Sequence, residues 1–283
     1  MARFILSAFA DEADASLDGQ IAALSRNGIN GVELRILNGE PFVKFSVEQA
    51  KEAKRKFDDN QITITALGSP FGKIGADDPF EPHLEQLKHA LELCGVMDCR
   101  RMRMFSFYMP KDKEPELFRG VVIDRIGAML NAAESAGVKL AHENEKGIYG
   151  DIPSRCVDLA RTFDGRLGCV FDPANFIQCG VNPGEAMDEL LPYITWMHIK
   201  DAKARDGQVT PAGHGDGGIA ELIRRVSARV PSDLVLSIEP HLALFSGFAH
   251  LERGENKPDF LYQNNDEAFD AACDALRLIL DKL

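Results

Sequence analysis

The sequence predicts a closed (β/α)8 barrel, the TIM barrel of α/β proteins, as a single domain over residues 1–283. Eight short apolar runs rich in β-forming residues alternate with eight longer amphipathic stretches, a pattern typical of repeated βα units and a parallel sheet. Eight such units close into a barrel, and the 283-residue chain is close to the common size of one. No GxGxxG motif follows the first run, which argues against an open dinucleotide-binding sheet.

Each strand and helix is expected from a local pattern. The apolar runs predict strands at Phe4–Phe9, Gly31–Leu34, Ile62–Leu67, Arg101–Ser106, Val138–Glu143, Leu167–Asp172, Ile194–Ile199 and Leu234–Glu239. The amphipathic stretches predict helices near residues 16–27, 46–58, 80–95, 115–136, 152–163, 184–191, 217–228 and 266–281. Ser46, Pro153 and Asn182 supply helix-start signals. The long segment 241–265, between the last strand and the last helix, is expected to be a functional loop or lid.

The composition excludes several classes of protein. Asp and Glu outnumber Lys and Arg by 44 to 32, so the formal net charge is −12, whereas nucleic-acid binding depends on clustered basic residues. The amino terminus lacks the apolar core and cleavage site of a signal peptide, and no apolar run reaches the roughly 18 residues of a membrane helix. The six cysteines show no CxxC spacing, as expected for free thiols. We therefore expect a cytoplasmic protein with no nucleic-acid or membrane partner.

Four consecutive expected strands end in a side chain that binds metal ions well, namely Glu143, Asp172, His198 and Glu239. Because the carboxyl ends of barrel strands share the face on which active sites of this fold lie, the four should meet there. A helix cap or an ion pair would explain any one of them, but not four strands that end alike. Three carboxylates and one imidazole suit Mn²⁺, Mg²⁺ or Co²⁺ and tolerate Zn²⁺. We expect one divalent ion, with Mn²⁺ favoured.

The same residues resemble a known pattern. Glu143 in Leu-Ala-His-Glu-Asn, Asp172 followed by Asn175, His198 in His-Ile-Lys-Asp and Glu239 in Ser-Ile-Glu-Pro-His look like the metal site of the xylose isomerase-like TIM-barrel superfamily. Within it they are most similar to the sugar phosphate isomerase/epimerase group that includes D-tagatose 3-epimerase. The resemblance covers essentially the whole chain. It implies that Glu143, Asp172, His198 and Glu239 hold one divalent metal ion, and that Glu143 and Glu239 are also the acid/base pair.

The activity that this resemblance implies is a metal-dependent sugar isomerase or epimerase. A metal ion that chelates the carbonyl and the neighbouring hydroxyl of the sugar acidifies the adjacent C–H and stabilises the enediolate. Carboxylates on opposite faces of that planar intermediate can remove a proton from one side and return one to the other. The alternative is a lyase on the same intermediate, which loses a leaving group by β-elimination, as in relatives that are inosose dehydratases or deglycosidases.

Two features differ from a simple ketose epimerase. Asn175 stands where members of the epimerase branch usually carry a histidine, and an asparagine cannot gain a charge near neutral pH. In addition, four segments resemble a subgroup related to sugar-guloside epimerases and C-glycoside deglycosidase subunits, whose members act on 3-keto glycosides. These segments are residues 8–12, 69–73, 103–108 and 142–146.

Further polar residues at the expected face are predicted to contact the substrate, namely Glu12, Arg35, Lys73, Arg103, Asn175, Lys200 and His241. For several of them a second interpretation stays open. Lys73 could be a solvated loop lysine, Arg35 and Arg103 could pair with Glu12 and Glu33, and His241 could orient a neighbouring ligand. His142 is expected to pack on the other side of its strand from Glu143. The glycine-rich segment 211–217 is a weak phosphate-binding cue without a basic residue.

Two other classes of function are compatible with a metal-binding barrel, namely a nuclease and a non-catalytic subunit. A metal-dependent DNA-repair nuclease on the same barrel would need several metal ions, more histidines at the rim and a basic face, whereas this chain has seven histidines and a negative balance. A subunit that uses the metal ion only for folding or for partner binding remains an alternative. The expected partner is a small-molecule sugar or sugar derivative, and a barrel rim with a long last loop is compatible with a homodimer.

Overall fold

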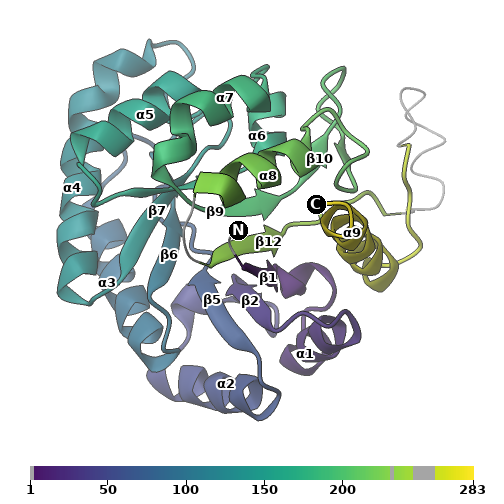
Figure 1. Cartoon of the computed structure of the whole chain (residues 1–283). Helices are drawn as coiled ribbons and strands as arrows, with labels where there is room; N and C mark the ends of the chain where they lie inside the picture. Colours follow the sequence, from purple (N-terminus) through teal and green to yellow (C-terminus); the bar gives the residue numbers. More distant parts are fainter. Residues whose placement is uncertain (1–2, 230–232, 245–258) are drawn as a thin grey trace, which may run out of the picture.

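The computed structural model describes residues 3–229, 233–244 and 259–283, and its centre is a closed barrel of parallel strands (Figure 1). Around the barrel the strands follow the order β1–β12–β9–β8–β7–β6–β5–β2. They are β1 (Phe4–Ala8), β2 (Gly31–Leu34), β5 (Thr63–Leu67), β6 (Arg101–Met104), β7 (Lys139–Glu143), β8 (Gly168–Phe171), β9 (Ile194–Ile199) and β12 (Leu234–Ile238). The predicted (β/α)8 barrel is confirmed.

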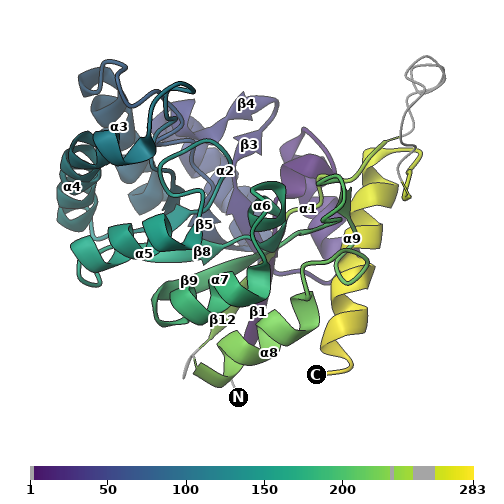
Figure 2. The same cartoon turned by 90° about the horizontal axis from the view of Figure 1, so that it is seen from above.

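The helices surround the ring of strands (Figure 1). They are α1 (Leu17–Arg26), α2 (Val47–Asp59), α3 (Glu81–Val96), α4 (Arg119–Ser135), α5 (Pro153–Thr162), α6 (Pro173–Gln178), α7 (Pro183–Leu190), α8 (Ile219–Arg229) and α9 (Asn265–Leu280). Two short antiparallel pairs add β3 (Ile36–Leu37) with β4 (Glu40–Pro41), and β10 (Asp201–Ala202) with β11 (Val209–Thr210). Figure 2 shows β3 and β4 at one end of the barrel and both chain termini at the other.

Local sequence signals explain where several helices begin. Ser46 forms a capping box with Gln49 at the start of α2, and Asn182 accepts hydrogen bonds from two backbone N–H groups at the start of α7. Pro153 occupies the first position of α5, where its missing N–H is no loss. These three predicted helix starts are confirmed. Within the described ranges, none of the helices combines the length and the apolar character that crossing a membrane requires.

The predicted bounds of the strands Gly31–Leu34 and Ile194–Ile199 are confirmed, whereas four other strands end earlier than predicted. Strands expected to include Phe9, Ser106, Asp172 and Glu239 end one or two residues earlier, because these residues already turn into the loops or caps of the barrel rim. The stretch predicted as one helix, 115–136, begins with a separate 3₁₀ turn at Pro115–Phe118. The short elements α6, β3, β4, β10 and β11 were missed because pieces of two to six residues carry too few positions to show a period.

The inside of the barrel explains why the strand ends converge. A small apolar layer formed by Ala66, Ala141, Val170, Trp196 and Val235 fills the barrel below its rim. Successive side chains of a strand alternate between two faces, so the residues two positions beyond Ala141, Val170 and Trp196 also point inward. Those residues are Glu143, Asp172 and His198. Because side chains alternate along each strand, a polar group lies directly above this apolar layer at the end of each of the three strands.

Candidate active site

The structure brings the four expected ligands together at the carboxyl ends of neighbouring strands. Glu143 ends β7, Asp172 follows β8, His198 lies in β9 and Glu239 follows β12. One ligand atom from each lies within 4.8 Å of those of the other three. All four side chains are almost completely buried. We refer to Glu143, Asp172, His198 and Glu239 as the ligand cluster.

The imidazole of His198 directs one nitrogen at the three carboxylates. Its Nδ1 lies 3.0 Å from Glu143 Oε1, 3.5 Å from Glu239 Oε2 and 3.8 Å from Asp172 Oδ2. The ring packs edge-on against Phe9, with 5.2 Å between the ring centroids. Nδ1 is therefore the nitrogen that faces a shared ligand position.

The donor atoms of the cluster fit a divalent cation. Glu143 Oε2 and Asp172 Oδ2 are buried, and neither accepts a hydrogen bond from the described part of the chain, although cations lie 3.1 Å and 2.8 Å away at Arg103 and Lys200. A buried carboxylate oxygen without a hydrogen-bond donor is costly unless a cation satisfies it. Carboxylate oxygens with one imidazole are a donor set that Mn²⁺, Mg²⁺, Co²⁺ and Zn²⁺ accept. The residues present therefore suit one divalent ion.

Neighbouring positive charges keep two of the carboxylates ionised. Burial alone would raise the pKa of Glu143, but the charges of His198 and Arg103 outweigh burial and lower the pKa to about 2. The pKa of Glu239 is likewise held well below its ordinary value, against the effect of burial, by Lys200 and His198. For Asp172 burial prevails over the attraction of Lys200, so its pKa rises to about 7.

Asp172 and Asn175 are held by the short helix α6. Asp172 caps this helix, since its Oδ1 accepts a hydrogen bond of 2.9 Å from the backbone N–H of Asn175. The amide of Asn175 donates to Glu143 Oε1 at 3.2 Å and to the carbonyl of Asn144 at 2.9 Å. Asn144 in turn exchanges two hydrogen bonds with the backbone of Asp172. Asn175 therefore orients a member of the ligand cluster and also lines the adjacent cavity.

Two arginines bridge the carboxylates at the rim. Arg35 contacts Asp11 at 2.8 Å, Glu12 at 3.1 Å and Glu239 at 3.3 Å. Arg103 lies 3.1 Å from Glu143 and 3.9 Å from Glu239. Both guanidinium groups lie over the ring of Phe9. The interpretation that Arg35 pairs with Glu12 is confirmed.

The suggested pairing of an arginine with Glu33 was wrong. In the described part of the chain, the hydrogen-bonding partner of the Glu33 carboxylate is His198 Nε2, at 3.2 and 3.3 Å from its two oxygens. Glu33 lies inside β2 with its side chain completely buried, whereas Arg35 follows the end of this strand and contacts Asp11, Glu12 and Glu239.

Lys73 and Lys200 are also paired with acids. Lys73 lies 2.8 Å from Glu145 and its ammonium group is over the ring of Phe105, so it is not a free loop lysine. Lys200 is almost completely buried, with its Nζ 2.8 Å from both Asp172 and Glu239. Two negative partners raise the pKa of Lys200 despite the opposing effect of burial. Its ammonium group contributes positive charge directly beside the ligand cluster.

Glu12 and His241 form a second polar pair at the edge of the site. The backbone N–H of His241 donates to Glu12 Oε2 at 2.6 Å, and its Nε2 lies 3.1 Å from Glu12 Oε1. The backbone of His241 has φ of 42°, a left-handed conformation that is unusual for histidine and clusters at functional sites. Burial lowers the pKa of His241 to about 4, while burial and the nearby Glu239 raise the pKa of Glu12 to about 7.

The cavity above the ligand cluster has a volume of about 350 Å³. Its wall includes six of the seven predicted substrate contacts, namely Arg35, Lys73, Arg103, Asn175, Lys200 and His241, together with Glu143 and Glu239. Glu12 does not line this cavity but lines a smaller hollow that shares His241 with it. Glu145 was missed as a cavity residue. Its position two residues after Glu143 was the available signal.

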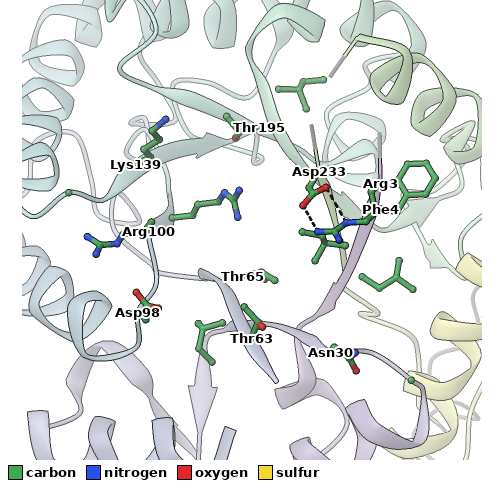
Figure 3. A pocket seen from close by; sticks show the side chains of 17 residues that line it. Arg3, Phe4, Asn30, Thr63, Thr65, Asp98, Arg100, Lys139, Thr195 and Asp233 are labelled. Atoms are coloured by element: carbon green, nitrogen blue, oxygen red, sulfur yellow. Dashed lines mark hydrogen bonds and ion pairs between the residues drawn. The ribbon is translucent and has the colours of Figure 1, made fainter. Parts of the chain in front are cut away.

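A larger hollow of about 1190 Å³ lies at the other end of the barrel (Figure 3). Residues at or near the starts of strands line it, including Thr63, Lys139 and Thr195, and an ion pair of 2.6 Å joins Arg3 to Asp233 there. No member of the ligand cluster lies among its lining residues. The smaller cavity at the strand ends is therefore the candidate active site.

The glycine-rich segment 211–217 does not offer its backbone to a phosphate. The carboxylate of Asp201 accepts hydrogen bonds of 2.8–3.1 Å from the backbone N–H groups of Gly213, Gly215 and Gly217. Because these donors are already used within the protein, the weak phosphate-binding cue is explained as an internal anchor. Of the expected lid, residues 245–258 lie outside the described residues.

Comparisons with known proteins agree with this architecture. No curated protein matches the chain. Among solved structures, the probable 3-DHS dehydratase AsbF from Bacillus anthracis has 17% sequence identity, a TM-score of 0.73 and coverage of 98% of this chain and 99% of its own. A D-tagatose 3-epimerase-like protein has 17% identity, a TM-score of 0.72 and coverage of 99% of each chain. The IOLI protein, solved with a bound zinc atom, has 16% identity, a TM-score of 0.76 and coverage of 99% of this chain and 98% of its own.

At these identities the structural likeness establishes the fold alone. The sequence comparison goes further, because the model of one family matches residues 21–281, nearly the whole chain. On this evidence the chain belongs to the xylose isomerase-like TIM barrel family.

Proposed function

We propose that this protein is a divalent-metal-dependent sugar isomerase or epimerase that works by proton abstraction next to a carbonyl. The observation that carries the proposal is the ligand cluster, in which two buried carboxylates from β7 and from the end of β12 meet His198 below a cavity. Similarity to a D-tagatose 3-epimerase-like protein supports the same reaction class. The family assignment supports a sugar-modifying activity.

The residues that would hold the ion are Glu143, Asp172, His198 and Glu239. When bound, a divalent cation there acidifies the C–H next to a sugar carbonyl and stabilises the enediolate oxygens. Mn²⁺ is our first choice because carboxylates dominate the donor set. The zinc atom in the IOLI protein supports a divalent ion in this fold.

The acid/base work falls to Glu143 and Glu239. Arg103 lies 3.1 Å from Glu143 and Lys200 lies 2.8 Å from Glu239, and these cations favour the ionised carboxylates, so each starts as a base rather than as an acid. They come from strands on different sides of His198, which supports proton removal on one face of a planar enediolate and proton return on the other. Arg103 lies between them and would neutralise negative charge that develops on the substrate. Their burial keeps bulk water away from this step.

The charges around the cavity favour an uncharged sugar as substrate. In the described part of the chain, Arg35, Lys73, Arg103 and Lys200 each lie within ion-pair distance of a carboxylate. The amides of the 213–217 loop are bound to Asp201. A phosphorylated sugar would have to displace one of these internal acids, whereas sugar hydroxyls can share the existing donors and acceptors. We therefore expect the free sugar to react faster than its phosphate.

The second candidate function is a lyase that eliminates a leaving group β to the carbonyl. The pair formed by Glu12 and His241 favours it, because His241 lines the cavity with Glu12 bound to it, and the pair could give a proton to a departing group. Asn175 in place of the histidine of the epimerase branch supports it as well. AsbF, a neighbour in fold, is named as a probable dehydratase.

Proton exchange in D₂O tests both candidates in one experiment. The Mn²⁺-loaded protein is incubated with free ketoses, ketose phosphates, inososes and 3-keto glycosides, and the products are analysed by NMR after protein and metal have been removed. Deuterium beside a carbonyl together with an epimer or an isomer supports the first function. An unsaturated ketone or a released aglycone without an epimer supports the lyase. Absence of both exchange and elimination product with every sugar, with metal binding verified, would contradict both and favour a non-catalytic metal-binding subunit.

A further inference from the structure

Glu33 is a buried carboxylate on the far side of His198 from the ligand cluster. It lies in β2, and its side chain is completely buried. The pairing of β2 with β5 shows a register shift between Val32 and Glu33. Irregularities of this kind re-aim a side chain and recur beside active sites. The position of Glu33 is therefore set by a local change in the barrel wall.

The contact between Glu33 and His198 is specific. His198 Nε2 lies 3.3 Å from Glu33 Oε1 and 3.2 Å from Glu33 Oε2, while Nδ1, on the other side of the ring, faces the cluster at 3.0 Å from Glu143. A buried carboxylate without a partner would be costly. Among the described residues, this imidazole is the group that supplies Glu33 with a hydrogen bond.

We infer that Glu33 is a positioning residue that fixes His198 as a metal ligand through Nδ1. A histidine ring carries its lone pair on one nitrogen when the other donates a hydrogen, and the acceptor of that hydrogen selects the tautomer. A carboxylate at Nε2 keeps the proton there and leaves the lone pair of Nδ1 directed at Glu143, Asp172 and Glu239. The edge-on contact with Phe9 fixes the plane of the ring.

The inference goes beyond the proposed reaction, since Glu33 does not line the cavity and would act only through His198. It does rest on the proposed metal site. Outer partners of metal-bound histidines typically change metal affinity by about 10- to 100-fold when they are removed. The expected effect is therefore on metal affinity first, and on turnover only through it.

The first test reads the protonation of His198 in the wild-type protein and uses a variant only to assign its signals. In full-length protein labelled with ¹⁵N-histidine and loaded with Zn²⁺, the ¹⁵N shifts of His198 are assigned by comparison with His198→Asn. We expect the proton on Nε2, with slow exchange against solvent. A His198 protonated on Nδ1 in the Zn²⁺ form overturns the inference.

The second test measures Mn²⁺ affinity by isothermal titration. Glu33→Ala should raise the dissociation constant of Mn²⁺ by about 10- to 100-fold. Glu33→Gln should raise it by less, because the amide oxygen can still accept a hydrogen bond from Nε2–H. Thr65→Val is the matched control. It removes a buried hydrogen-bonding group in the barrel, bonded to Ser7 and to the carbonyl of Val32, without touching His198. It should keep the wild-type affinity.

The outcomes separate this inference from the proposed function. If wild type binds Mn²⁺ and Glu33→Ala binds it equally well, the positioning role is wrong while the metal site stands. If Glu33→Ala does not fold, Glu33→Gln carries the test, and unchanged Mn²⁺ affinity together with an Nδ1-protonated His198 contradicts the role. A wild-type protein that binds no divalent ion overturns both proposals.

Discussion

At the scale of single residues, the side of the strand decides what a side chain does. His142 and Glu143 are adjacent, yet His142 bonds to Ser106 Oγ at 2.9 Å while Glu143 points to the ligand cluster. Burial lowers the pKa of His142 to about 4, so the ring is neutral at ordinary pH. The prediction of His142 as a packed histidine is consistent with this contact. Of these two neighbours, His142 therefore serves packing and Glu143 belongs to the candidate site.

Replacing either proposed base should slow the reaction strongly. Glu143→Gln and Glu239→Gln are each expected to lower kcat by about 10²- to 10⁴-fold, the usual contribution of a positioned acid or base. The measurement is turnover of the sugar identified by exchange in D₂O, at saturating Mn²⁺. Glu145→Gln is the control, because Glu145 lines the same cavity but pairs with Lys73. Near-normal kcat in either base variant would rule out the two-carboxylate mechanism.

Lys200 should stabilise the folded protein by neutralising its acidic neighbours. Lys200→Met leaves Asp172 and Glu239 without the ammonium group that lies 2.8 Å from both. Removing one partner of a buried ion pair typically lowers the free energy of unfolding by about 3–5 kcal/mol. Urea unfolding with chelator present should show this loss, and saturating Mn²⁺ should reduce it.

Lys73→Met is the comparison for that experiment. Its ion pair with Glu145 is part-exposed, and such pairs contribute about 1 kcal/mol or less. An equal loss of stability in the two variants would show that Lys200 has no special part in charge neutralisation.

At the scale of elements, the turns after the strands are held by specific side chains. The β9 end is anchored through Asp201 to the 213–217 loop, and the loop after β5 is anchored through His83 in α3, whose Nε2 accepts a hydrogen bond of 2.8 Å from Gly72 N–H. Gly72 has φ of 92°, and a Cβ there would lie 2.0 Å from the carbonyl oxygen of Phe105. This turn therefore requires a glycine at position 72 and an unprotonated Nε2 on His83 that accepts its hydrogen bond.

The turn at Gly72 should make stability depend on pH. Burial and the nearby Arg125 lower the pKa of His83 below 6.5, and a protonated ring could no longer accept from Gly72. Below pH 6.5 the unfolded chain binds a proton that the folded chain resists, so the free energy of unfolding falls as pH decreases. The fall ends below the folded-state pKa.

His83→Gln isolates this contribution, because its amide oxygen can still accept from Gly72 without titrating. The free energy of unfolding in urea is measured for wild type and variant between pH 7.5 and pH 4.5. As the pH decreases, it should fall more for the wild type than for the variant. A difference that stays constant across this range would exclude the linkage.

At the scale of the whole molecule, the fold should not depend on the metal ion. The described core joins strands and helices around the entire barrel, while the ligand cluster occupies only one end of it. Chelation should therefore leave the far-ultraviolet circular dichroism unchanged. At a metal concentration of about 100 times Kd, binding adds about 2.7 kcal/mol to the free energy of unfolding.

For a chain of this size that addition corresponds to a rise in Tm of about 4–5 °C. Thermal unfolding with Mn²⁺ and with chelator measures it, and Glu143→Gln combined with Asp172→Asn should remove the difference. Loss of helical structure on chelation would instead indicate a metal ion required for folding.

Local pattern was sufficient for the barrel and for most of the site. Eight βα units and the alternation within β7 and β9 were visible in the sequence, because apolar periodicity is a property of neighbouring residues. The ends of four strands carried the ligand cluster for the same reason. Helix starts at Ser46 and Asn182 follow from the chemistry of one or two side chains.

The pairing of side chains across the barrel could not be obtained in that way. Glu33 and His198 are 165 positions apart, and Arg35 contacts Glu239 across 204 positions. Asp201 accepts hydrogen bonds from the backbone N–H groups of the 213–217 loop, which the sequence suggested could bind a phosphate. Periodicity determines which side of a strand a residue occupies, but barrel closure and register determine which strand lies opposite. The sequence by itself therefore determined the fold and the candidate ligands, and the tertiary structure decided which charges meet.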